Sequence, residues 1–486
     1  MADHIAAVHE LRRSFRRLPK DAPVRLGKPT SNLFRFREST NTHRLDVSAF
    51  SSVLSVDPVS RTAEVGGMTT YEDLVAATLP HGLMPLVVPQ LRTITLGGAV
   101  TGLGIESSSF RNGLPHESVQ EIEILTGAGD VVVARPDNEH RELFRGFPNS
   151  YGTLGYSLRI RIELEPVRPY VHLRHLPFTD APAAMSALER VCAQGEHAGQ
   201  RVDFVDGVAF GPNELYLTLA TFVDRAPWTS DYTGSDIYYT SIPRYAGSGP
   251  GDYLTTEDYL WRWDTDWFWC SRAFGVQHPV VRRLWPRRWK RSDVYRKLVA
   301  LDRRTDFSRL LAHYRGKPQS EPVIQDIEVG VDRGAEFLEF FHAQIGMRPI
   351  WMCPLRLRPD AKDGVRTGAD AEAGADAAPR DSGVAGAAEA GPRWPLYPLD
   401  EDRLYVNFGF WGLVPSLPGL AHDHHNRLIE REVSRLGGHK SLYSDAFYDE
   451  DEFWELYNGV GYRDLKTAYD PDGRLLDLYA KCVGNR

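Results

Sequence analysis

Short runs of alternating apolar and polar residues fill the first third of the chain, and this alternation predicts β-strands joined by tight turns. Two apolar runs within Val53–Val65 are split by an Asp-Pro pair, which is typical of a hairpin. Val119–Leu125 and Val131–Val133 flank a Gly-Ala-Gly-Asp turn in the same way. Every second residue of Leu158–Leu164 is apolar, so we expect a half-buried strand there.

A helix is predicted in the same region, over Thr69–Leu79. Either of the two threonines at its start can cap the first turn, and Leu74, Val75 and Leu79 fall on one face. Strands, turns and this helix together predict an α+β domain over residues 1–168.

The next boundary is marked by the prolines of Pro166–Pro169. Residues 169–440 mix strand and helix patterns and contain most of the tryptophans, which predicts an α/β substrate (cap) domain. Within them, residues 361–393 have almost no large apolar side chains. Such a segment cannot offset the entropy of ordering, so we expect a disordered surface insertion. Residues 441–486 are again rich in aromatic side chains and should pack back on the body.

Composition and charge narrow the functional classes. A chain of 486 residues exceeds what one hydrophobic core usually holds, and a hydrophobic content of 42% suits a well-packed globular protein. The net charge of −8 provides no electrostatic footprint for nucleic acid, so we expect no nucleic-acid partner. Arg supplies most of the 57 basic residues and Lys is rare, which indicates a GC-rich, bacterial source.

The cysteines and the lengths of the apolar runs indicate where in the cell the protein is located. Cys192, Cys270, Cys353 and Cys482 are widely spaced and form no CxxC pair, so we expect reduced thiols in a cytoplasmic protein. No stretch approaches the ~20 apolar residues of a membrane span, and the N-terminus lacks an apolar signal region. We therefore expect that the protein is not an integral membrane protein.

A Gly-rich segment, Thr95–Ser109 with Gly113 just beyond, carries the main chemical signal. Glycines permit positive φ and let backbone N–H groups approach a ligand closely, as in loops that bind pyrophosphate. A Rossmann pattern fails because no acidic residue closes a βαβ unit, and a P-loop fails because no Gly-Lys-Ser/Thr follows. Taken alone, the segment fits a structural turn as well as a cofactor loop.

The surrounding motifs decide between these interpretations. Val87–Pro89, Thr93–Gly98, Val119–Leu125 and Ser150–Gly155, in this order and spacing, resemble the FAD-binding domain of the vanillyl-alcohol-oxidase (p-cresol methylhydroxylase, PCMH-type) flavoproteins. The resemblance implies that the first domain binds FAD and that the Gly-rich loop cradles its pyrophosphate. It assigns cofactor contacts to Gly97, Gly98, Thr101, Gly102, Gly104, Ser107, Gly113, Thr153 and Gly155.

Two further segments match this family less closely. Gly27–Asn32 takes the place of its first phosphate loop, with contacts expected from Thr30 and Ser31. Because this loop departs from Arg-Gly-Gly-His-Ser and lacks the histidine, we expect FAD to be bound non-covalently. Lys466, followed by Tyr-Asp-Pro at 469–471, resembles the tail that covers the flavin, so residues 441–486 should pack near it.

A closer resemblance extends over most of the chain. Gly104–Ser109, Pro349–Pro354, Tyr443–Asp445 and Glu452–Glu455 resemble the Δ24-sterol (24-dehydrocholesterol) reductases. This implies FAD-dependent reduction of an isolated C=C bond with NADPH as the electron donor. The N-terminal membrane segment of that family has no counterpart here, so we expect a different route of substrate delivery. A related actinobacterial group reduces the 10-methylene branch of a fatty acyl chain to a methyl, which implies a methyltransferase acting upstream.

Both substrates pose the same chemical problem. An unactivated alkene accepts hydride poorly, but its protonation gives a tertiary carbocation to which flavin N5 can deliver hydride. The site therefore needs an acid, a cavity that excludes water and electron-rich walls. The candidate acids are Glu106, Tyr443 and Asp445; the alternatives are that Glu106 anchors its loop, and that Tyr443 and Asp445 serve core packing and capping.

Three other clusters of residues have possible functional roles. For two of them a structural role is equally compatible with the sequence, and for the third we predict a structural role. The aromatic run Trp261–Trp269 either lines a lipid tunnel or belongs to the core. Arg282–Arg291 mixes basic residues with tryptophan, which suits either peripheral contact with an anionic membrane or a solvated helix. The histidines of His422–His425 precede an amphipathic helix, so we interpret them as its polar start and predict no metal.

We therefore expect an FAD-dependent oxidoreductase acting on CH–CH groups of a lipid, with a 10-methylene fatty acyl chain favoured and a Δ24-sterol next. Two alternatives stay open: an alcohol or sugar oxidase or dehydrogenase on the same scaffold, and a non-catalytic lipid-binding flavoprotein.

Overall fold

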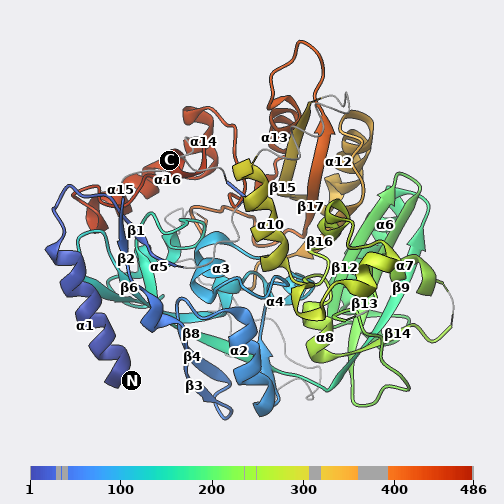
Figure 1. Ribbon diagram of the computed structural model, residues 1–486, viewed down its shortest axis with the longest axis horizontal. Coiled ribbons are helices and arrows are strands. Elements are labelled where there is room, and N and C mark those ends of the chain that lie inside the picture. The colour runs from blue at the N-terminus through green and yellow to red at the C-terminus, as the bar shows by residue number, and fades with distance from the viewer. Residues whose placement is uncertain are drawn as a thin grey trace, which may run out of the picture.

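The chain folds around two large β-sheets with helices packed on both (Figure 1). The computed structural model describes residues 2–28, 34–35, 42–234, 236–247, 249–305, 319–359 and 392–483. Thr30, Ser31 and the predicted insertion as far as residue 391 lie outside the described residues. A six-stranded sheet is built from the first 166 residues and an eight-stranded sheet from residues 170–440, which is an α+β architecture.

The six-stranded sheet confirms the strands expected from the alternation of apolar residues. Its order is β3 (Val53–Asp57), β4 (Thr62–Gly66), β8 (Tyr156–Pro166), β6 (Val119–Leu125) and β7 (Val131–Ala134), with β5 (Leu83–Pro85) paired to β8. Both predicted hairpins, β3–β4 and β6–β7, are antiparallel. The four apolar residues of β8 predicted to share one face are all buried.

Short helices flank this sheet. The predicted helix is α2 (Tyr71–Thr78), which begins after Thr70, whose side chain accepts a hydrogen bond from the Asp73 backbone N–H. The remaining elements are α1 (Ala2–Arg17), α3 (Leu96–Gly102), α4 (Ser109–Asn112), α5 (Arg141–Gly146), the 3-10 turns η1 (Ser48–Phe50), η2 (Leu79–His81) and η3 (Pro115–Ser118), and the parallel pair β1 (Val24–Leu26) and β2 (His43–Leu45). Among these, α3 packs on β8 and β4, which places the Gly-rich segment on the sheet.

The eight-stranded sheet forms a second layer with its own core. Its order is β14 (Asp252–Thr255), β9 (Tyr170–Phe178), β13 (Glu214–Val223), β12 (Phe204–Gly211), β16 (Ile350–Leu355), β17 (Tyr405–Pro415), β15 (Ser320–Gly330) and β18 (His439–Lys440). The helices that pack against it include α6 (Ala181–Gln194), α12 (Val331–Gln344) and α13 (His424–Arg435). A small hairpin, β10 (Glu196–His197) and β11 (Gln200–Arg201), follows α6. The amphipathic helix predicted after the histidines is α13, and it buries Ile429 and Val433.

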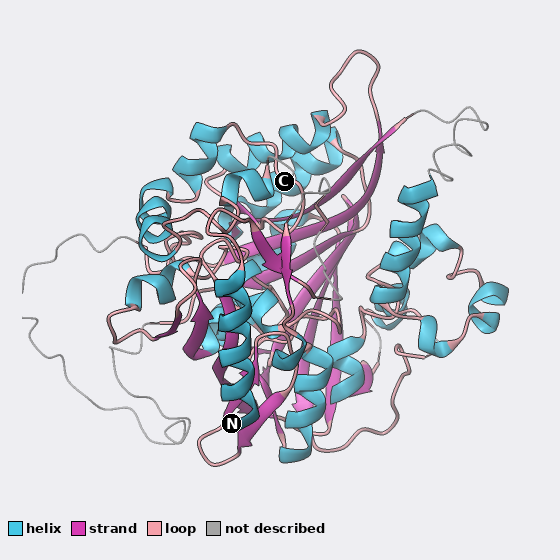
Figure 2. Cartoon of the chain, turned by 60° about the vertical axis from the view of Figure 1, so that its left-hand side comes forward, coloured by secondary structure: helices cyan, strands magenta, loops and turns pink. Residues whose placement is uncertain are grey.

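Between β13 and β15 the chain is mostly helical and contributes only the edge strand β14 to the sheet (Figure 2). The helical elements of this segment are α7 (Tyr238–Tyr245), α8 (Thr256–Trp261), η4 (Cys270–Phe274), α9 (Pro279–Leu284), η5 (Arg287–Trp289) and α10 (Ser292–Thr305). The aromatic run lies within it, and the structure divides that run. Trp261, Trp263 and Trp269 are buried in the core, whereas Trp267 lines a cavity.

The C-terminal helices return to the first sheet (Figure 1). These are α14 (Glu450–Leu456), α15 (Gly459–Tyr469) and α16 (Leu478–Cys482). The Lys466 ammonium of α15 donates a hydrogen bond to the Thr153 carbonyl at 2.9 Å. The hydroxyl of Tyr469 hydrogen-bonds His140 Nδ1 at 2.9 Å. The tail therefore lies against the element that carries Thr153.

Candidate functional site

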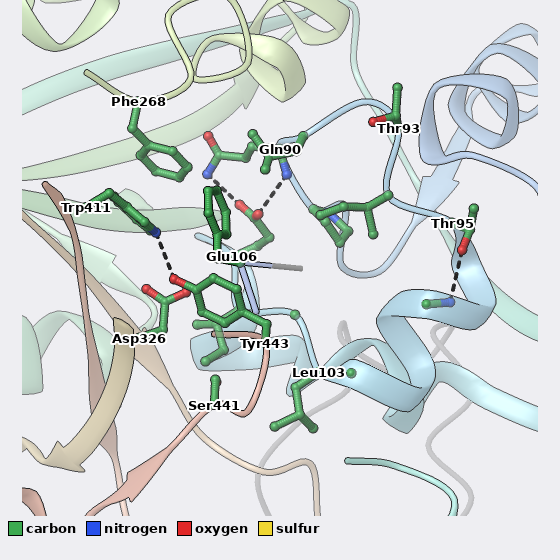
Figure 3. A pocket seen from close by; sticks show the side chains of 18 of the residues that line it. Gln90, Thr93, Thr95, Leu103, Glu106, Phe268, Asp326, Trp411, Ser441 and Tyr443 are labelled. Atoms are coloured by element: carbon green, nitrogen blue, oxygen red, sulfur yellow. Dashed lines mark hydrogen bonds between the residues drawn. The ribbon is translucent and has the colours of Figure 1, made fainter. Parts of the chain in front are cut away.

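A cavity of about 1250 Å³, including its open mouth, lies where the Gly-rich segment meets β15, β17 and the aromatic run. Figure 3 shows Glu106, Tyr443, Trp411 and Phe268 lying around the same space. Apolar and aromatic side chains form most of its wall: Phe34, Leu91, Ile94, Leu103, Ile105, Trp267, Phe268, Trp351 and Trp411.

The Gly-rich segment forms one edge of this cavity through helix α3. The Thr95 hydroxyl caps the helix by accepting a hydrogen bond from the Gly98 N–H at 3.1 Å. Gly98, Thr101 and Gly102 then face the cavity. A Cβ on Gly98 would lie 2.8 Å from Thr95 Oγ1, so a side chain there would displace the cap and fill part of the wall.

A second, polar cavity of about 970 Å³ adjoins the first and shares Lys28, Gly98, Thr101 and Tyr151 with it. Four cationic side chains line it: Arg25, Lys28, Arg44 and Lys481. Such a ring of positive charge is complementary to the two phosphates of a dinucleotide. Gly97, Gly152 and Gly155 also line it. The joined cavities thus fit FAD, with a cationic part for the pyrophosphate and an apolar part for the ring.

Backbone strain concentrates at these cavities. Leu103, Tyr151, Trp267 and Phe268 all have positive φ, at 62°, 50°, 46° and 59°, and all four line a cavity. A non-glycine residue in such a conformation costs on the order of 1–3 kcal/mol and usually persists where function requires it. Half of the eight described non-glycine residues with positive φ are therefore at this site.

Glu106 lies on the cavity wall, buried to 7% exposure. Its carboxyl oxygens accept hydrogen bonds from the Gln90 backbone N–H at 2.8 Å and from Gln90 Nε2 at 2.5 Å. Burial raises the pKa of Glu106 to about 8, against the opposing effect of these bonds. The side chain is thus both anchored, as in the structural alternative, and protonated at neutral pH, as an acid requires.

Tyr443 also faces the cavity. Beside it lies the carboxyl group of Asp326, which the sequence did not lead us to predict as a site residue. The Tyr443 hydroxyl accepts a hydrogen bond from Trp411 Nε1 at 2.7 Å, and Asp326 of β15 lies beside it (Figure 3). Burial raises the pKa of Asp326 to about 7. The signal available in the sequence was the pair Asp326 and Glu328 among the apolar residues Ile324, Ile327 and Val329 of β15. Charged residues in a buried strand deserve a functional explanation.

Several predicted site residues lie elsewhere. Asp445 does not line either cavity, and its backbone carbonyl accepts a hydrogen bond from Lys440 at 2.7 Å. Thr153 is buried with its hydroxyl bonded to the Ser150 carbonyl. Ser107 lies behind Glu106, where its hydroxyl is 3.1 Å from that of Tyr259. Of the predicted cofactor contacts, those that line one of these two cavities are Gly97, Gly98, Thr101, Gly102, Gly104 and Gly155.

Two of the three predicted histidines, His424 and His425, form the first turn of α13, and the contacts of His425 are structural. His425 donates its backbone N–H to Glu321 at 3.0 Å, and its Nδ1 lies 2.7 Å from the same carboxylate. This supports their interpretation as the polar start of a helix. Within the described ranges, no cluster of three His, Cys, Asp or Glu side chains is arranged to hold a metal ion.

Replacing Gly98 by alanine tests whether this edge holds the cofactor. The added methyl group must displace the Thr95 hydroxyl and enters the wall shared by both cavities. Overpacking of this kind costs about 1–3 kcal/mol, so we expect FAD affinity to fall by about tenfold or more. The visible flavin absorbance retained after dialysis measures it. Gly211→Ala is the control, because the nearest atom to its Cβ is 3.5 Å away. Equal flavin retention by both variants would show that Gly98 does not contact FAD.

Comparisons with known proteins agree with this geometry. Residues 14–135 match the family of the FAD binding domain. The chain is 24% identical to Delta(24)-sterol reductase of Arabidopsis thaliana over 458 residues, covering 91% of this chain and 77% of that protein. It is 25% identical to the human Delta(24)-sterol reductase over 452 residues, covering 90% and 78%. Cytokinin dehydrogenase 6 of Oryza sativa is 35% identical over 117 residues, covering 24% of this chain and 22% of that protein.

These similarities assign a cofactor and a reaction class. The chain has an FAD-binding domain of the PCMH type and is an FAD-dependent oxidoreductase related to the Delta(24)-sterol reductases. No helix in the described part of the chain is both long and apolar enough to cross a membrane.

Proposed function

We propose that the protein reduces an isolated C=C bond of a lipid, with NADPH as the electron donor. The observation that carries this proposal is the cavity itself, which sets a buried carboxylic acid, Glu106, against aromatic walls beside the Gly-rich segment. An alcohol or sugar would call for polar partners along the wall. Most of this wall is apolar instead.

The aromatic wall suits a reaction that passes through positive charge. Phe268 and Trp411 pack with ring centroids 4.3 Å apart, and Phe268 and Trp351 with centroids 5.4 Å apart. The faces of such rings attract cations, and the attraction strengthens where water is excluded. Protonation of a trisubstituted or 1,1-disubstituted alkene gives a tertiary carbocation, which this wall would stabilise.

The chain's residues would hold the cofactor at the other side of the cavity. The cationic groove with Arg25, Arg44 and Lys481 would bind the pyrophosphate, and Gly98 and Thr101 would lie along the ring. Bound FAD supplies the hydride for the reduction. The strained residues Trp267 and Phe268 keep the opposite wall apolar and exclude water.

Glu106 is the proton donor in this proposal. Its raised pKa keeps it protonated near neutral pH, and Gln90 fixes its orientation through two hydrogen bonds. A general acid with a pKa near the working pH is the most effective. The Tyr443 side chain also lines the cavity, and burial raises the pKa of Asp326 beside it to about 7, so this pair is the alternative proton source.

Two lipid classes satisfy this chemistry. A 10-methylene fatty acyl chain is favoured, because the Arg-rich composition indicates a bacterial source. A Δ24-sterol is the second candidate, supported by the relatives that are named Delta(24)-sterol reductase.

Mass spectrometry of the product tests the proposal. We expect purified FAD-loaded protein with NADPH to add two hydrogens to a phospholipid carrying a 10-methylene acyl chain, and to do so faster than to a Δ24-sterol. The reverse order would assign the sterol as substrate. No mass gain in either lipid, together with rapid oxygen consumption on adding alcohols or sugars, would contradict the proposal and favour an oxidase.

A further inference from the structure

The helical segment around α9, η5 and α10 exposes an unusual amount of apolar surface. Five of the twelve exposed large hydrophobic side chains of the described residues lie in it, so their clustering calls for an explanation. Their exposed fractions are 78% for Leu284, 61% for Val280, 58% for Leu301, 46% for Trp289 and 37% for Val281. Exposed apolar residues gathered in one segment commonly mark a contact with another molecule or with lipid.

The same segment carries strong positive charge in an acidic protein. Over residues 270–301 the exposed basic side chains are Arg272, Arg283, Arg287, Arg288 and Lys297. The one carboxylate in this range, Asp293, already pairs with Arg291 and Lys297. Against a net charge of −8 for the whole chain, this concentration of cations is complementary to an anionic surface.

A polar hollow adjoins the exposed apolar residues. It measures about 860 Å³ and lies between α7 and α9, lined by Arg244, Arg283 and Lys290 together with the carboxylate of Asp236. Guanidinium and ammonium groups in such a hollow can receive the phosphate of a lipid headgroup. The apolar residues Val280 and Leu284 of α9 would then enter the acyl region beside it.

The segment is also continuous with the wall of the main cavity. Tyr295 of α10 and Val276 share a hydrophobic cluster with Trp267, which lines that cavity. Phe274 stacks on Tyr295 with ring centroids 5.6 Å apart. A surface that contacts this segment would therefore lie next to the cavity wall.

We propose that the face formed by α9, η5 and the exposed side of α10 docks the protein on anionic lipid bilayers. Tryptophan with basic residues is the side-chain combination that favours the bilayer interface and its anionic headgroups. The docking follows from these residues alone. Its use, to bring a bilayer lipid to the cavity, rests on the proposed function.

Vesicle flotation tests the docking without any measurement of turnover. We expect the FAD-loaded protein to float with phosphatidylcholine vesicles containing one part in three of phosphatidylglycerol, and not with pure phosphatidylcholine. High salt should weaken the binding, because exposed charges are screened. The pair Arg283→Glu with Arg288→Glu, and separately the pair Leu284→Ser with Trp289→Ser, should each weaken binding by at least about tenfold. The matched control, Arg225→Glu with Arg431→Glu, changes exposed arginines elsewhere and should bind as the wild type does.

The outcomes separate docking from catalysis. Both variant pairs should retain turnover of a detergent-dispersed lipid alkene and lose it with the same lipid in anionic vesicles. Wild-type protein that fails to float, or equal binding by all variants, would overturn the docking proposal whatever the turnover shows. If the wild type does not float but sediments as a dimer that the Leu284→Ser and Trp289→Ser pair dissociates, a second copy of the chain covers this face instead. Flotation without turnover of any lipid alkene would leave docking supported and contradict the reductase function.

Discussion

Glu106→Gln is expected to slow lipid-alkene reduction by about 10²–10⁴-fold, the usual contribution of a positioned general acid. The amide has the size of the carboxyl but no proton acidic enough to transfer. The local structure should survive, because Gln90 Oε1 has no hydrogen-bond partner and can accept one from the new amide once the Gln90 side chain turns over. Single-turnover kinetics with the flavin absorbance recorded on the same sample measure both the rate and the cofactor content.

The pH dependence of wild-type turnover should reflect the titration of the Glu106 carboxyl. Only protonated Glu106 can donate, and its pKa is raised to about 8, so the rate should fall as pH rises through about 8. Glu106→Gln should lack this alkaline limb. Glu117→Gln is the control, since Glu117 is a second buried carboxyl with a pKa raised to about 7 that pairs with Arg393 away from the cavity.

Two results would show that Glu106 is not the proton donor. Wild-type turnover and an intact alkaline limb in Glu106→Gln would move the proton source to Tyr443 and Asp326, whose variants Tyr443→Phe and Asp326→Asn would then be slow. Loss of flavin from Glu106→Gln would show that the residue anchors its loop.

Arg262→Met is expected to destabilise the fold by about 3–5 kcal/mol, the range found when one partner of a buried ion pair is removed. Arg262 Nη2 lies 2.7 Å from Asp206 Oδ2, and the two side chains are 1% and 2% exposed. The guanidinium also lies 3.9 Å from the ring centroid of Tyr259. Without it, the Asp206 carboxylate stays buried with the indole N–H groups of Trp263 and Trp351 as distant donors.

Chemical denaturation of a double-mutant cycle measures this loss. Arg262→Met combined with Asp206→Asn should recover much of the stability, because no unpaired charge stays buried. Since Arg262 lowers the pKa of Glu106 and Asp206 raises it, folded Arg262→Met should shift the alkaline limb of turnover to higher pH and Asp206→Asn should shift it to lower pH. Equal stability of Arg262→Met and the wild type would show that the pair contributes little to the fold.

Sequence patterns predicted those elements that are stabilised by residues close to one another in the chain. The hairpins β3–β4 and β6–β7 and the capped helix α2 follow from alternation, turn residues and one threonine cap, and all three are confirmed. The Gly-rich segment was singled out because glycines let a backbone approach a ligand closely, and the structure adds that some of them allow close packing on the sheet. Gly97 shows this plainly, since a Cβ there would lie 2.2 Å from Ser157 Oγ.

Features that depend on long-range pairing were not predictable in this way. Asp326 reaches the cavity because β15 pairs with β17 and because the Ser441 N–H binds its carbonyl at 3.0 Å, contacts that span about a hundred residues of sequence. The sequence left open whether the tryptophans of the aromatic run line a lipid tunnel or belong to the core. The chain turns through two left-handed residues, Trp267 and Phe268, which point to the cavity while their neighbours enter the core.

Glycine alone was an ambiguous signal for cofactor contact. Gly113 has a φ of +67°, and a Cβ there would lie 1.9 Å from Glu117 Oε2, so the turn itself requires glycine. It lines neither of the two cavities that we assign to FAD. A glycine needed for backbone conformation and one needed for ligand approach look the same in a sequence.

An anaerobic single-turnover experiment determines whether the reduced flavin in this cavity transfers its electrons to an isolated lipid alkene. The flavin is first reduced chemically, and then mixed without oxygen with a phospholipid carrying a 10-methylene acyl chain. We predict that the oxidised flavin spectrum returns and that one saturated, methyl-branched chain forms per flavin, while the corresponding saturated lipid has no effect. A flavin that stays reduced with both the methylene lipid and a Δ24-sterol, yet reoxidises rapidly when air is admitted, would show that the protein is an oxidase and not a reductase of lipid alkenes.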